Sequence, residues 1–593
     1  MCGIAGEITF DGSTASAAVV DKMADVLQKR GPDGQGLWAQ GRVAFGHRRL
    51  KIIDLSENAQ QPMVDPDLGL TIVFNGCIYN YRALRKTLQD KGYRFFAHSD
   101  TEVILKAFHF WGADCVDHFH GMFAFAIYDR ETGRTTFARD RLGIKPFYYA
   151  EVAGGLRFAS TLPALVAGGG IDTSIDPVGL NHYMNFHAVV PPPRTLLNGI
   201  KKLPPAHIMT VKADGTRALK RYWQVDYSRG DAETNMDETA WTDQVLESLR
   251  VSVKRRLEAD VPVGVLLSGG VDSSLIVGLL AEQGAKDLNT FSVGFETVGE
   301  EAGDEFKYSD IIAERFDTTH HKIFVDSAKR LLPELPACIA AMSEPMVSHD
   351  SIGFFLLSEE VSRHVKVVQS GQGADEVFGG YHWYPPMVHS QSPTDDYARV
   401  FCDRSHAEYR ETVTPRFYGD GDDHARAFIA ERFAEPGATS GIAKALRMDT
   451  HVMLVDDPVK RVDTMTMAWG LEARVPFLDH EVVELAARIP PALHIKHDGK
   501  HLLKEAARRV IPASVIDRPK GYFPVPALKY LRGSVLDMVR EVVTDKTFTQ
   551  RNIVQCGYID RLLENPDDHI TPLRGSKLWQ VALLGLWLNA HDL

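Results

Sequence analysis

"LLSGGVDSSLIVGLL" (266–280) decides the fold of the C-terminal part of the chain. An apolar run typical of a buried strand passes through two glycines into a second apolar run typical of a helix. Glycines at such a turn let a phosphate approach the backbone, and the helix N-terminus offers N–H donors and partial positive charge. A Gly-Gly turn capped by Asp or Ser would explain a few of these residues, but not the whole run. The stretch therefore predicts a strand–loop–helix phosphate site.

Asp272 lies inside this phosphate loop, where its carboxylate would be repelled by the phosphates. A bridging Mg²⁺ removes this conflict, because hard cations bind carboxylate and phosphate oxygens together. The hydroxyl groups of Ser268, Ser273 and Ser274 add further donors. The loop therefore predicts a phosphate group bound together with Mg²⁺.

The segments around the loop indicate a parallel sheet. "WTDQVLESLRVSVKRRLEA" (241–259) has the spacing of an amphipathic helix, and "LNTFSVGF" (288–295) reads as the next strand. Strand–helix–strand units favour an α/β domain with a parallel sheet, and the remaining sequence to 593 reads as mostly helical. We expect this domain to cover 241–593, after a polar linker at 216–240.

Residues 1–215 follow a different pattern. "GLTIVFNGCIYN" (69–80) and "GMFAFAIYD" (121–129) are short apolar runs bounded by turn residues, which is typical of strands. Between them, 81–92 and 101–112 carry apolar residues at helical spacing. This mixture predicts an α+β sandwich as a separate N-terminal domain.

The bulk composition excludes several classes of protein. The chain has 593 residues and a formal net charge of −12, which gives no electrostatic reason to expect nucleic acid or an anionic membrane as a partner. Its 6 cysteines are scattered without a CxxC pair, so no disulfide framework or zinc site is indicated. The N-terminus lacks the pattern of a signal peptide, and we expect a cytoplasmic location.

Cys2 stands next to the initiator Met. Removal of the Met would leave Cys2 with a free α-amino group, whose ordinary pKa of about 7.7–8.0 lets it act as a base near a thiol nucleophile. A stray cysteine in an expendable tail is the alternative. Cys2 alone does not decide between them.

Four further motifs follow Cys2 in order: "RGPDG" (30–34), "GHRRLKIIDLS" (46–56), "VFNGCIYNY" (73–81) and "SDTEVIL" (99–105). With them, the first 200 residues or so resemble the N-terminal-nucleophile glutaminase domain of class II glutamine amidotransferases. The resemblance implies that Cys2 attacks the glutamine amide to form a thioester and release ammonia. It also implies an oxyanion hole made by Asn75 and Gly76, with Arg49 and Asp100 binding the α-carboxylate and the α-ammonium of glutamine.

The glutaminase resemblance breaks at one position. The family usually has Asn-Gly-Glu where this chain has Asn75-Gly76-Cys77, and that Glu helps to position glutamine. Its loss puts the strength of glutamine binding in doubt, but not the chemistry. Cys77 itself is expected to be a small buried thiol rather than a reactive one.

The loop at 268–274 resembles that of adenylating ATP pyrophosphatases. "SGQGADEVFGGYHWY" (370–384), "VDTMTMAWGLEARVPFLD" (462–479) and "DGKHLLKEAARRVIP" (498–512) resemble the asparagine synthetase family, and that resemblance covers nearly the whole chain. It implies that Asp272 and Asp375 bind Mg²⁺ and that Lys500 neutralises developing charge. The residues implied to contact ATP or pyrophosphate are Leu267, Ser268, Gly269, Gly270, Asp272, Ser273, Ser274, Val293 and Gly371.

Two departures concern the acceptor substrate. Gln372 stands where the family has a Glu near the acyl-adenylate, and Thr464 stands where a Lys or Arg is usual. Together with "NFHAVVPPPRTLL" (185–197) and "TPLRGSKLWQ" (571–580), these residues resemble the N-acetylglutaminylglutamine amidotransferase branch. The segments 298–310 and 385–425 are expected to enlarge the acceptor pocket.

The expected activity is that of a carbon–nitrogen ligase that forms AMP and takes its amide nitrogen from glutamine. The expected acceptor is N-acetylglutaminylglutamine, whose amide would serve as an osmolyte; aspartate, as in asparagine synthetase, is the alternative. Ring closure as in β-lactam synthetases is disfavoured because those enzymes have lost the N-terminal cysteine. A catalytically inactive glutamine or nucleotide sensor is disfavoured by Cys2, Asp272 and Asp375. A homodimer is an open alternative.

Overall fold

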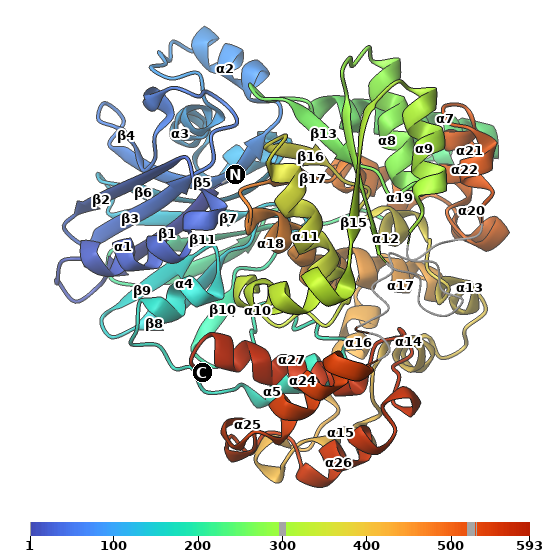
Figure 1. Ribbon diagram of the computed structural model, residues 1–593. Helices are drawn as coiled ribbons and strands as arrows, with labels where there is room; N and C mark the ends of the chain where they lie inside the picture. Colours follow the sequence, from blue (N-terminus) through green and yellow to red (C-terminus); the bar gives the residue numbers. More distant parts are fainter. Residues whose placement is uncertain (1, 296–303, 519–527, 529–530) are drawn as a thin grey trace.

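The computed structural model describes residues 2–295, 304–518, 528 and 531–593. A sandwich of two sheets occupies the N-terminal part, and a third sheet surrounded by helices occupies the C-terminal part (Figure 1). Within the described ranges, none of the helices combines the length and the apolar character that a membrane span needs.

Two six-stranded sheets form the N-terminal sandwich. The first has the order β10-β8-β9-β1-β3-β2, with bounds β1 Cys2–Thr9, β2 Gly34–Gln40, β3 Val43–Arg49, β8 Tyr148–Val152, β9 Gly155–Ala159 and β10 Ile200–Lys202. The second has the order β12-β11-β7-β6-β5-β4, with bounds β4 Met63–Asp65, β5 Leu70–Ile78, β6 Gly121–Asp129, β7 Arg134–Arg139, β11 His207–Val211 and β12 Arg217–Arg221.

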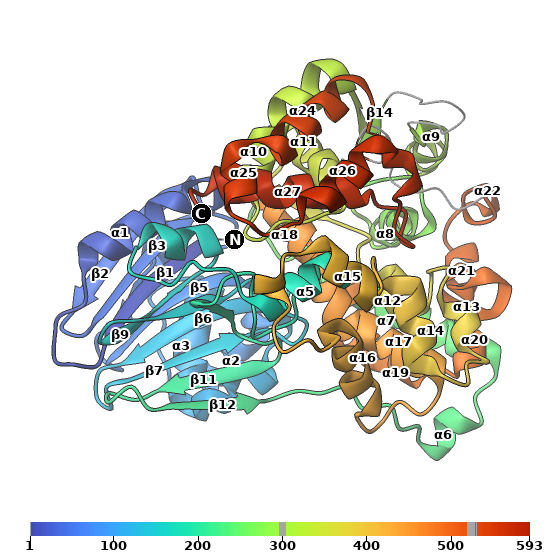
Figure 2. The same ribbon diagram turned by 90° about the horizontal axis from the view of Figure 1, so that it is seen from below.

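Helices cover the outer faces of the sandwich. Figure 2 shows α1 (Ala17–Val26) on the first sheet, and α2 (Tyr81–Asp90) and α3 (Asp100–Trp111) on the second. Helix α4 (Leu162–Ala167) also packs on the first sheet, beside β9 (Figure 1). The predicted α+β sandwich and its two long helices are therefore confirmed. The second sheet extends beyond the expected domain end at 215, because β12 pairs with β11.

β5 explains how one strand serves both the core and the site. Successive side chains on a strand point to opposite faces. Ile72 and Phe74 pack under the helices, whereas Val73 packs in the core between the two sheets. Asn75 and Cys77 continue the face of Val73, so the alternation turns both toward the first sheet, where β1 carries Cys2.

The third sheet is entirely parallel, with the order β15-β14-β13-β16-β17. Its bounds are β13 Val263–Leu266, β14 Asn289–Phe295, β15 Thr319–Val325, β16 Val367–Gln369 and β17 Glu472–Arg474. The predicted strand–loop–helix is confirmed, with α8 at Val271–Glu282. The chain passes from β13 outward through β14 to β15, and later places β16 and then β17 on the other side of β13. Ligands of parallel sheets bind at the carboxyl ends of strands beside such a switch point.

Helices make up most of the rest. Those nearest the third sheet are α7 Glu238–Arg255, α9 Phe306–Arg315, α10 Leu332–Ala341, α11 Asp350–Ser362, α12 Ala374–Phe378, α18 Lys460–Met467, α19 His480–Arg488, α20 Pro491–Ile495, α21 His501–Arg508 and α22 Ala513–Ile516. The lower layer of Figure 1 contains α5 Pro177–Asn185, α13 Tyr384–Met387, α14 Pro393–Phe401, α15 His406–Thr412, α16 His424–Ala434, α17 Gly441–Met448, α24 Gly533–Thr544, α25 Lys546–Gln550, α26 Cys556–Glu564 and α27 Lys577–Ala590. The expected linker is partly helical, because α6 (Asp231–Thr234) and the start of α7 fall inside it.

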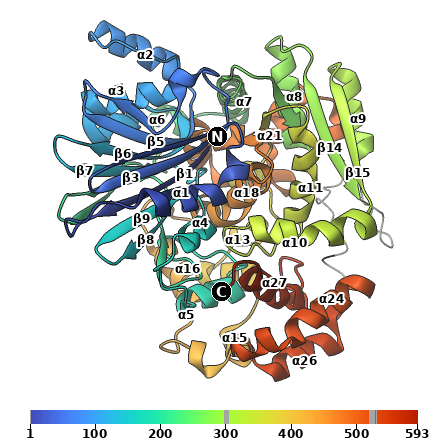
Figure 3. The same ribbon diagram turned by 60° about the vertical axis from the view of Figure 1, so that its left-hand side comes forward.

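The N-terminus lies at the junction of the two parts. Figures 1 and 3 both place it between the sandwich and the elements of the third sheet, near α18, and Figure 1 shows β17 close by. Cys2 is therefore an internal residue of the folded molecule rather than a frayed end, and its exposed fraction is 7%.

Candidate active sites

The first site surrounds Cys2, the first residue of β1. Its cross-strand partner on β3 is Arg49. The backbone nitrogen of Cys2 donates to Asn75 Oδ1 at 3.0 Å, which fixes the end of the chain against β5. Burial raises the pKa of the Cys2 thiol, so a nearby base has to take its proton before it can attack.

Asn75 and Gly76, the residues predicted to form an oxyanion hole, lie beside Cys2. The side-chain nitrogen of Asn75 is buried and, within the described part of the chain, has no hydrogen-bond partner. A buried donor without a partner costs free energy unless a ligand satisfies it. A Cβ on Gly76 would lie only 2.1 Å from the carbonyl oxygen of Met122, so the backbone there has no room for a side chain.

Arg49 and Asp100 lie in the same cavity as Cys2. Arg49 is buried, and its guanidinium donates to the carbonyl oxygens of Asp54 and Ser56. Asp100 begins α3, and its Oδ2 accepts a hydrogen bond from the backbone nitrogen of Ile78 at 3.0 Å. The cavity is small, about 30 Å³, and is lined by Cys2, Arg49, Leu50, Ile52, Ile53, Ala59, Gln61, Phe74, Gly76, Cys77, Ser99, Asp100, Thr101, Glu472 and Arg474.

Cys77 is a buried thiol, as expected from its sequence context. Burial raises its pKa, which makes it a poor nucleophile. Its Sγ lies 3.7 Å from Nη2 of Arg474, a residue on β17. This neighbour could not be predicted from the sequence, because the contact joins residues that are far apart along the chain.

The second site lies at the switch point of the parallel sheet. A cavity of about 510 Å³ opens at the carboxyl ends of β13, β14 and β16. Of the residues predicted to act in this domain, those lining it are Leu267, Ser268, Gly270, Asp272, Ser273, Val293, Gly371, Gln372, Asp375 and Lys500. Gly269 and Ser274 are not part of this lining: Gly269 supplies a turn with φ of 75°, and Ser274 is buried in α8.

Three charged groups meet in this cavity. Lys500 Nζ lies 2.6 Å from Asp272 Oδ2 and 3.0 Å from Asp375 Oδ2. Burial alone would lower the pKa of Lys500, but the two carboxylates outweigh it and raise the pKa. Lys500 itself begins α21 in a left-handed conformation with φ of 53°. Such backbone is uncommon outside glycine and often marks a functional position.

These residues fit a magnesium ion. Asp272 and Asp375 lie in the first turns of α8 and α12, the helices that follow the adjacent strands β13 and β16, and both carboxylates reach one ammonium group. A pair of convergent carboxylate oxygens is the donor set that Mg²⁺ prefers when phosphates complete its coordination. The structure therefore supports Asp272 and Asp375 as the residues that would hold the ion.

Two cationic residues of this cavity were missed by the sequence analysis. Lys504 lies four positions after Lys500, one helical turn along α21, and this spacing could have revealed it. Arg518 also lines the cavity; it pairs with Glu305 at 2.5 Å and lies over the ring of Tyr308. Both side chains add positive charge beside the predicted phosphate loop.

The two residues predicted to contact the acceptor substrate lie in different cavities. Gln372 lines the large cavity, whereas Thr464 lines a different, very small cavity where α18 meets the N-terminal sandwich. Residues 385–425 form α13, α14 and α15 and contribute none of the described residues lining the large cavity, so the expectation that they enlarge it is not supported. Residues 298–303 lie outside the described residues, but Asp304, Glu305 and Phe306 line the cavity.

A buried ionic bridge connects the Cys2 site to α18. Arg30 Nε donates to the carbonyl oxygen of Cys2 at 3.4 Å, and Arg30 Nη2 lies 2.9 Å from Asp463 Oδ2 on α18. Lys145 binds the other oxygen of Asp463 at 2.9 Å. Burial would raise the pKa of Asp463, but the two cations outweigh it and lower the pKa. The backbone of Cys2 is thus held by a side chain paired with the residue next to Thr464.

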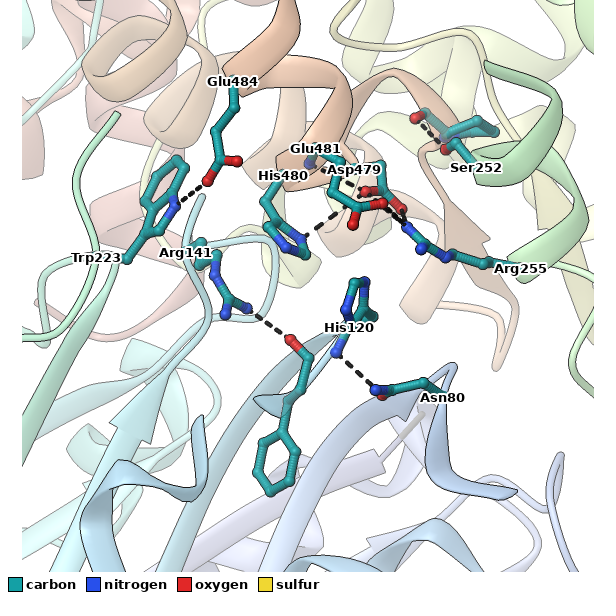
Figure 4. Close-up of polar contacts among 12 residues, drawn as sticks. Asn80, His120, Arg141, Trp223, Ser252, Arg255, Asp479, His480, Glu481 and Glu484 are labelled. Atoms are coloured by element: carbon teal, nitrogen blue, oxygen red, sulfur yellow. Dashed lines mark hydrogen bonds and ion pairs between the residues drawn. The ribbon is translucent and has the colours of Figure 1, made fainter. Parts of the chain in front are cut away.

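A second part of the interface contains two histidines (Figure 4). Potential ligand atoms of His120, His480 and Glu481 all lie within 4.8 Å of one another. However, Arg255 already forms ion pairs with Glu481 and with Asp479, and this positive charge opposes a further cation. Burial lowers the pKa of His480 to about 3 and also lowers that of His120, so both imidazoles are neutral at pH 7. The cluster serves as a packed domain contact.

Family models and relatives agree with this division of the chain. A model described as asparagine synthase matches residues 244–589, and one described as a glutamine amidotransferase domain matches residues 1–223. Asparagine synthetase [glutamine-hydrolyzing] 3 of Bacillus subtilis (strain 168) is 32% identical over 591 residues, with 95% of this chain and 93% of that protein covered. The chain belongs to the asparagine synthetase family. As a member, it is a carbon–nitrogen ligase that uses glutamine and ATP.

Other relatives carry different names. Amidase chry2 of Gibberella zeae (strain ATCC MYA-4620 / CBS 123657 / FGSC 9075 / NRRL 31084 / PH-1) is 26% identical over 644 residues, with 94% of this chain and 93% of that protein covered. Among solved structures, the glutamine phosphoribosylpyrophosphate amidotransferase of B. subtilis matches at 14% identity and a TM-score of 0.31, covering 55% of this chain and 90% of that chain.

Proposed function

We propose that this family member activates the C-terminal carboxylate of N-acetylglutaminylglutamine with ATP and amidates it with ammonia released from glutamine at Cys2. The products are the dipeptide amide, glutamate, AMP and pyrophosphate. The proposal depends on the presence of two sites in one chain. One surrounds Cys2, and the other contains the Asp272–Lys500–Asp375 cluster, with Gln372 lining the same cavity.

At the first site, the free amine of Cys2 would take the thiol proton, and Sγ would attack the amide carbon of glutamine. The oxyanion that forms would be bound by Asn75 Nδ2, the buried donor described above, and by the Gly76 backbone. The carbon–nitrogen bond then breaks, ammonia leaves with a proton returned by the amine, and water cleaves the thioester to release glutamate. Arg49 and Asp100 would orient the α-carboxylate and the α-ammonium.

At the second site, the acceptor carboxylate would attack the α-phosphate of ATP and displace pyrophosphate. Ser268, Gly270 and Ser273 would bind the pyrophosphate beside the N-terminus of α8. Bound Mg²⁺ would supply charge neutralisation of the phosphate oxygens, with Asp272 and Asp375 as its protein ligands. Lys500 is positioned to neutralise charge on the pyrophosphate or on the adduct with ammonia. Ammonia would travel between the sites inside the protein.

Gln372 supports an acceptor that lacks an α-ammonium group. Its amide offers both a donor and an acceptor, which suits the amide groups of an acetylated dipeptide. Such a substrate has no α-ammonium group and so needs no carboxylate at this position. Aspartate is the second candidate, because the acidic side chain of Glu376 also lines the cavity and could pair with an α-ammonium.

Measuring pyrophosphate release for each acceptor separates the two candidates. The protein is incubated with ATP, Mg²⁺ and glutamine, together with either N-acetylglutaminylglutamine or aspartate, and the amide is identified by mass spectrometry. We expect pyrophosphate and amide with the dipeptide. Turnover with aspartate alone would reject the dipeptide and assign the chain as an asparagine synthetase.

The binding of glutamine should depend on pH through Asp100. Burial, assisted by the negative charge of Glu472, raises the pKa of Asp100 to about 6. Only the charged carboxylate pairs with an α-ammonium, so affinity should be fully present above pH 6 and fall about tenfold per unit below it. Calorimetry of glutamine binding to the Cys2→Ala variant measures this without turnover. An affinity that stays constant from pH 7 to pH 5 would exclude Asp100 as the partner.

A further inference from the structure

The cavity around Cys2 contains residues from both parts of the chain. Thirteen of its positions belong to the N-terminal sandwich, but Glu472 and Arg474 come from β17, the edge strand of the parallel sheet. Both are almost completely buried, with exposed fractions of 1% and 0%. The pocket that faces Cys2 is therefore closed by the ATP-binding part of the molecule.

Arg474 is held by its own part of the chain. Its Nη1 donates to the carbonyl oxygens of Arg256 and Glu258 at 2.9 and 2.8 Å, and its Nε lies 2.5 Å from Glu472 Oε1. Burial would raise the pKa of Glu472, but the guanidinium of Arg474 outweighs it and lowers the pKa to about 2. Glu472 is therefore a charged carboxylate in a fixed position on the wall of the cavity.

The charges lining the cavity match those of an amino acid zwitterion. Among its described lining residues, Asp100 and Glu472 are the acidic side chains, and Arg49 and Arg474 are the basic ones. Arg474 is engaged with Glu472, which leaves Arg49 to face a carboxylate. Glu472 is near enough to Asp100 to contribute to the rise in its pKa. A second carboxylate close to Asp100 makes this part of the cavity more favourable for a cation.

The N-terminal part lacks a carboxylate at one position of this site. Cys77 follows Asn75 on the same face of β5, so its side chain points toward β17. A thiol with a raised pKa carries no charge at pH 7 and cannot pair with an ammonium group. Negative charge on this side of the cavity comes from Glu472 across the domain boundary.

We propose that Glu472 binds the α-ammonium group of glutamine together with Asp100, so that β17 of the ATP-binding part completes the glutamine pocket. The inference rests on the proposed glutamine site at Cys2. It makes glutamine affinity depend on the docking of β17, and it assigns to Glu472 a role in selecting substrates that carry an α-ammonium.

Glu472→Gln keeps the shape of the side chain and removes its charge. We expect the KM for glutamine to rise about 10- to 100-fold, the range for losing a hydrogen bond to a charged group. The ammonia-dependent rate should stay within about threefold, because the ATP site is not changed. Glu481→Gln is the matched control: it is the same substitution at the same domain boundary, next to His120 but outside the cavity, and should leave the KM for glutamine unchanged.

A substrate comparison separates binding from a merely structural role. 4-Carbamoylbutanoate is glutamine without its α-ammonium. If Glu472 binds that group, Glu472→Gln should weaken use of glutamine about tenfold or more while changing use of 4-carbamoylbutanoate by less than about threefold. Equal losses for the two amides would overturn the proposal, as would an unchanged KM for glutamine.

A second variant guards against misfolding, because Glu472→Gln leaves Arg474 without its carboxylate partner. Cys77→Glu combined with Glu472→Gln supplies a carboxylate from β5, within reach of the same guanidinium. We expect this double variant to recover most of the lost glutamine affinity; failure to recover it in a folded protein with normal ammonia-dependent activity would contradict the proposal. If Cys2→Ala retained glutaminase activity, the proposed glutamine site itself would be wrong.

Discussion

Cys2→Ala should lower glutamine-dependent amide formation more than about 1000-fold, the scale of losing a catalytic nucleophile, while free ammonia still supports the reaction at nearly the wild-type rate. The reason is that Sγ of Cys2 forms the covalent bond, whereas the phosphate loop and Lys500 lie in a separate cavity. The measurement compares amide formation from glutamine with that from ammonium chloride at equal protein concentration.

Two controls accompany the Cys2 variant. An N-terminal extension that prevents removal of Met1 leaves Cys2 in place but blocks its amine, and should cause the same selective loss. Cys556→Ala changes an exposed cysteine far along the chain and should have no effect. Loss of the ammonia-dependent reaction together with the glutamine-dependent one would contradict the two-site description.

Asp272→Asn should reduce pyrophosphate release about 100-fold or more with either nitrogen source. Asp272 is one of the two carboxylates that meet Lys500, and it would also hold Mg²⁺. An amide of the same shape removes the negative charge that both interactions need. Exchange of labelled pyrophosphate into ATP measures this step without amide formation.

The control for Asp272→Asn lies on the same helix. Glu282 lies at the other end of α8, where its carboxylate pairs with Arg250 on the surface at 3.0 Å. Glu282→Gln removes this acidic group and should leave the exchange of pyrophosphate into ATP unchanged. If Asp272→Asn still formed the amide from ammonia at the wild-type rate, the assignment of the adenylating site would be wrong.

Local sequence patterns predicted much of the fold. The apolar runs at β5, β13 and α8 are bounded by turn residues, so strand, loop and helix could be predicted from neighbouring residues. The parallel order of the third sheet followed from strand–helix–strand units. The end of the sandwich at β12 was missed, because Arg217–Arg221 is largely exposed and lacks an apolar run.

The candidate sites were predicted less completely. Most residues of the ATP site lie within short motifs, but Arg518 reaches the cavity only through tertiary packing. Glu472 and Arg474 also reach their cavity only through tertiary packing. They lie in "GLEARVPFLD" (470–479), which resembles the family motif, but the residues around them do not indicate that β17 faces Cys2. The motif predicted that Thr464 contacts the acceptor. In the structure Thr464 lines the small cavity beside Asp463 and not the large one, because this face of α18 packs against the sandwich.

The most direct test of the account is the origin of the transferred nitrogen. The protein is given glutamine labelled with nitrogen-15 in its amide, an excess of unlabelled ammonium chloride, ATP, Mg²⁺ and N-acetylglutaminylglutamine, and the isotope content of the product amide is measured by mass spectrometry. We expect most of the product to carry nitrogen-15, because ammonia released at Cys2 reaches the acyl-adenylate inside the protein. Product whose label matches the ammonia in bulk solution, or the absence of labelled amide while glutamine is hydrolysed, would contradict it.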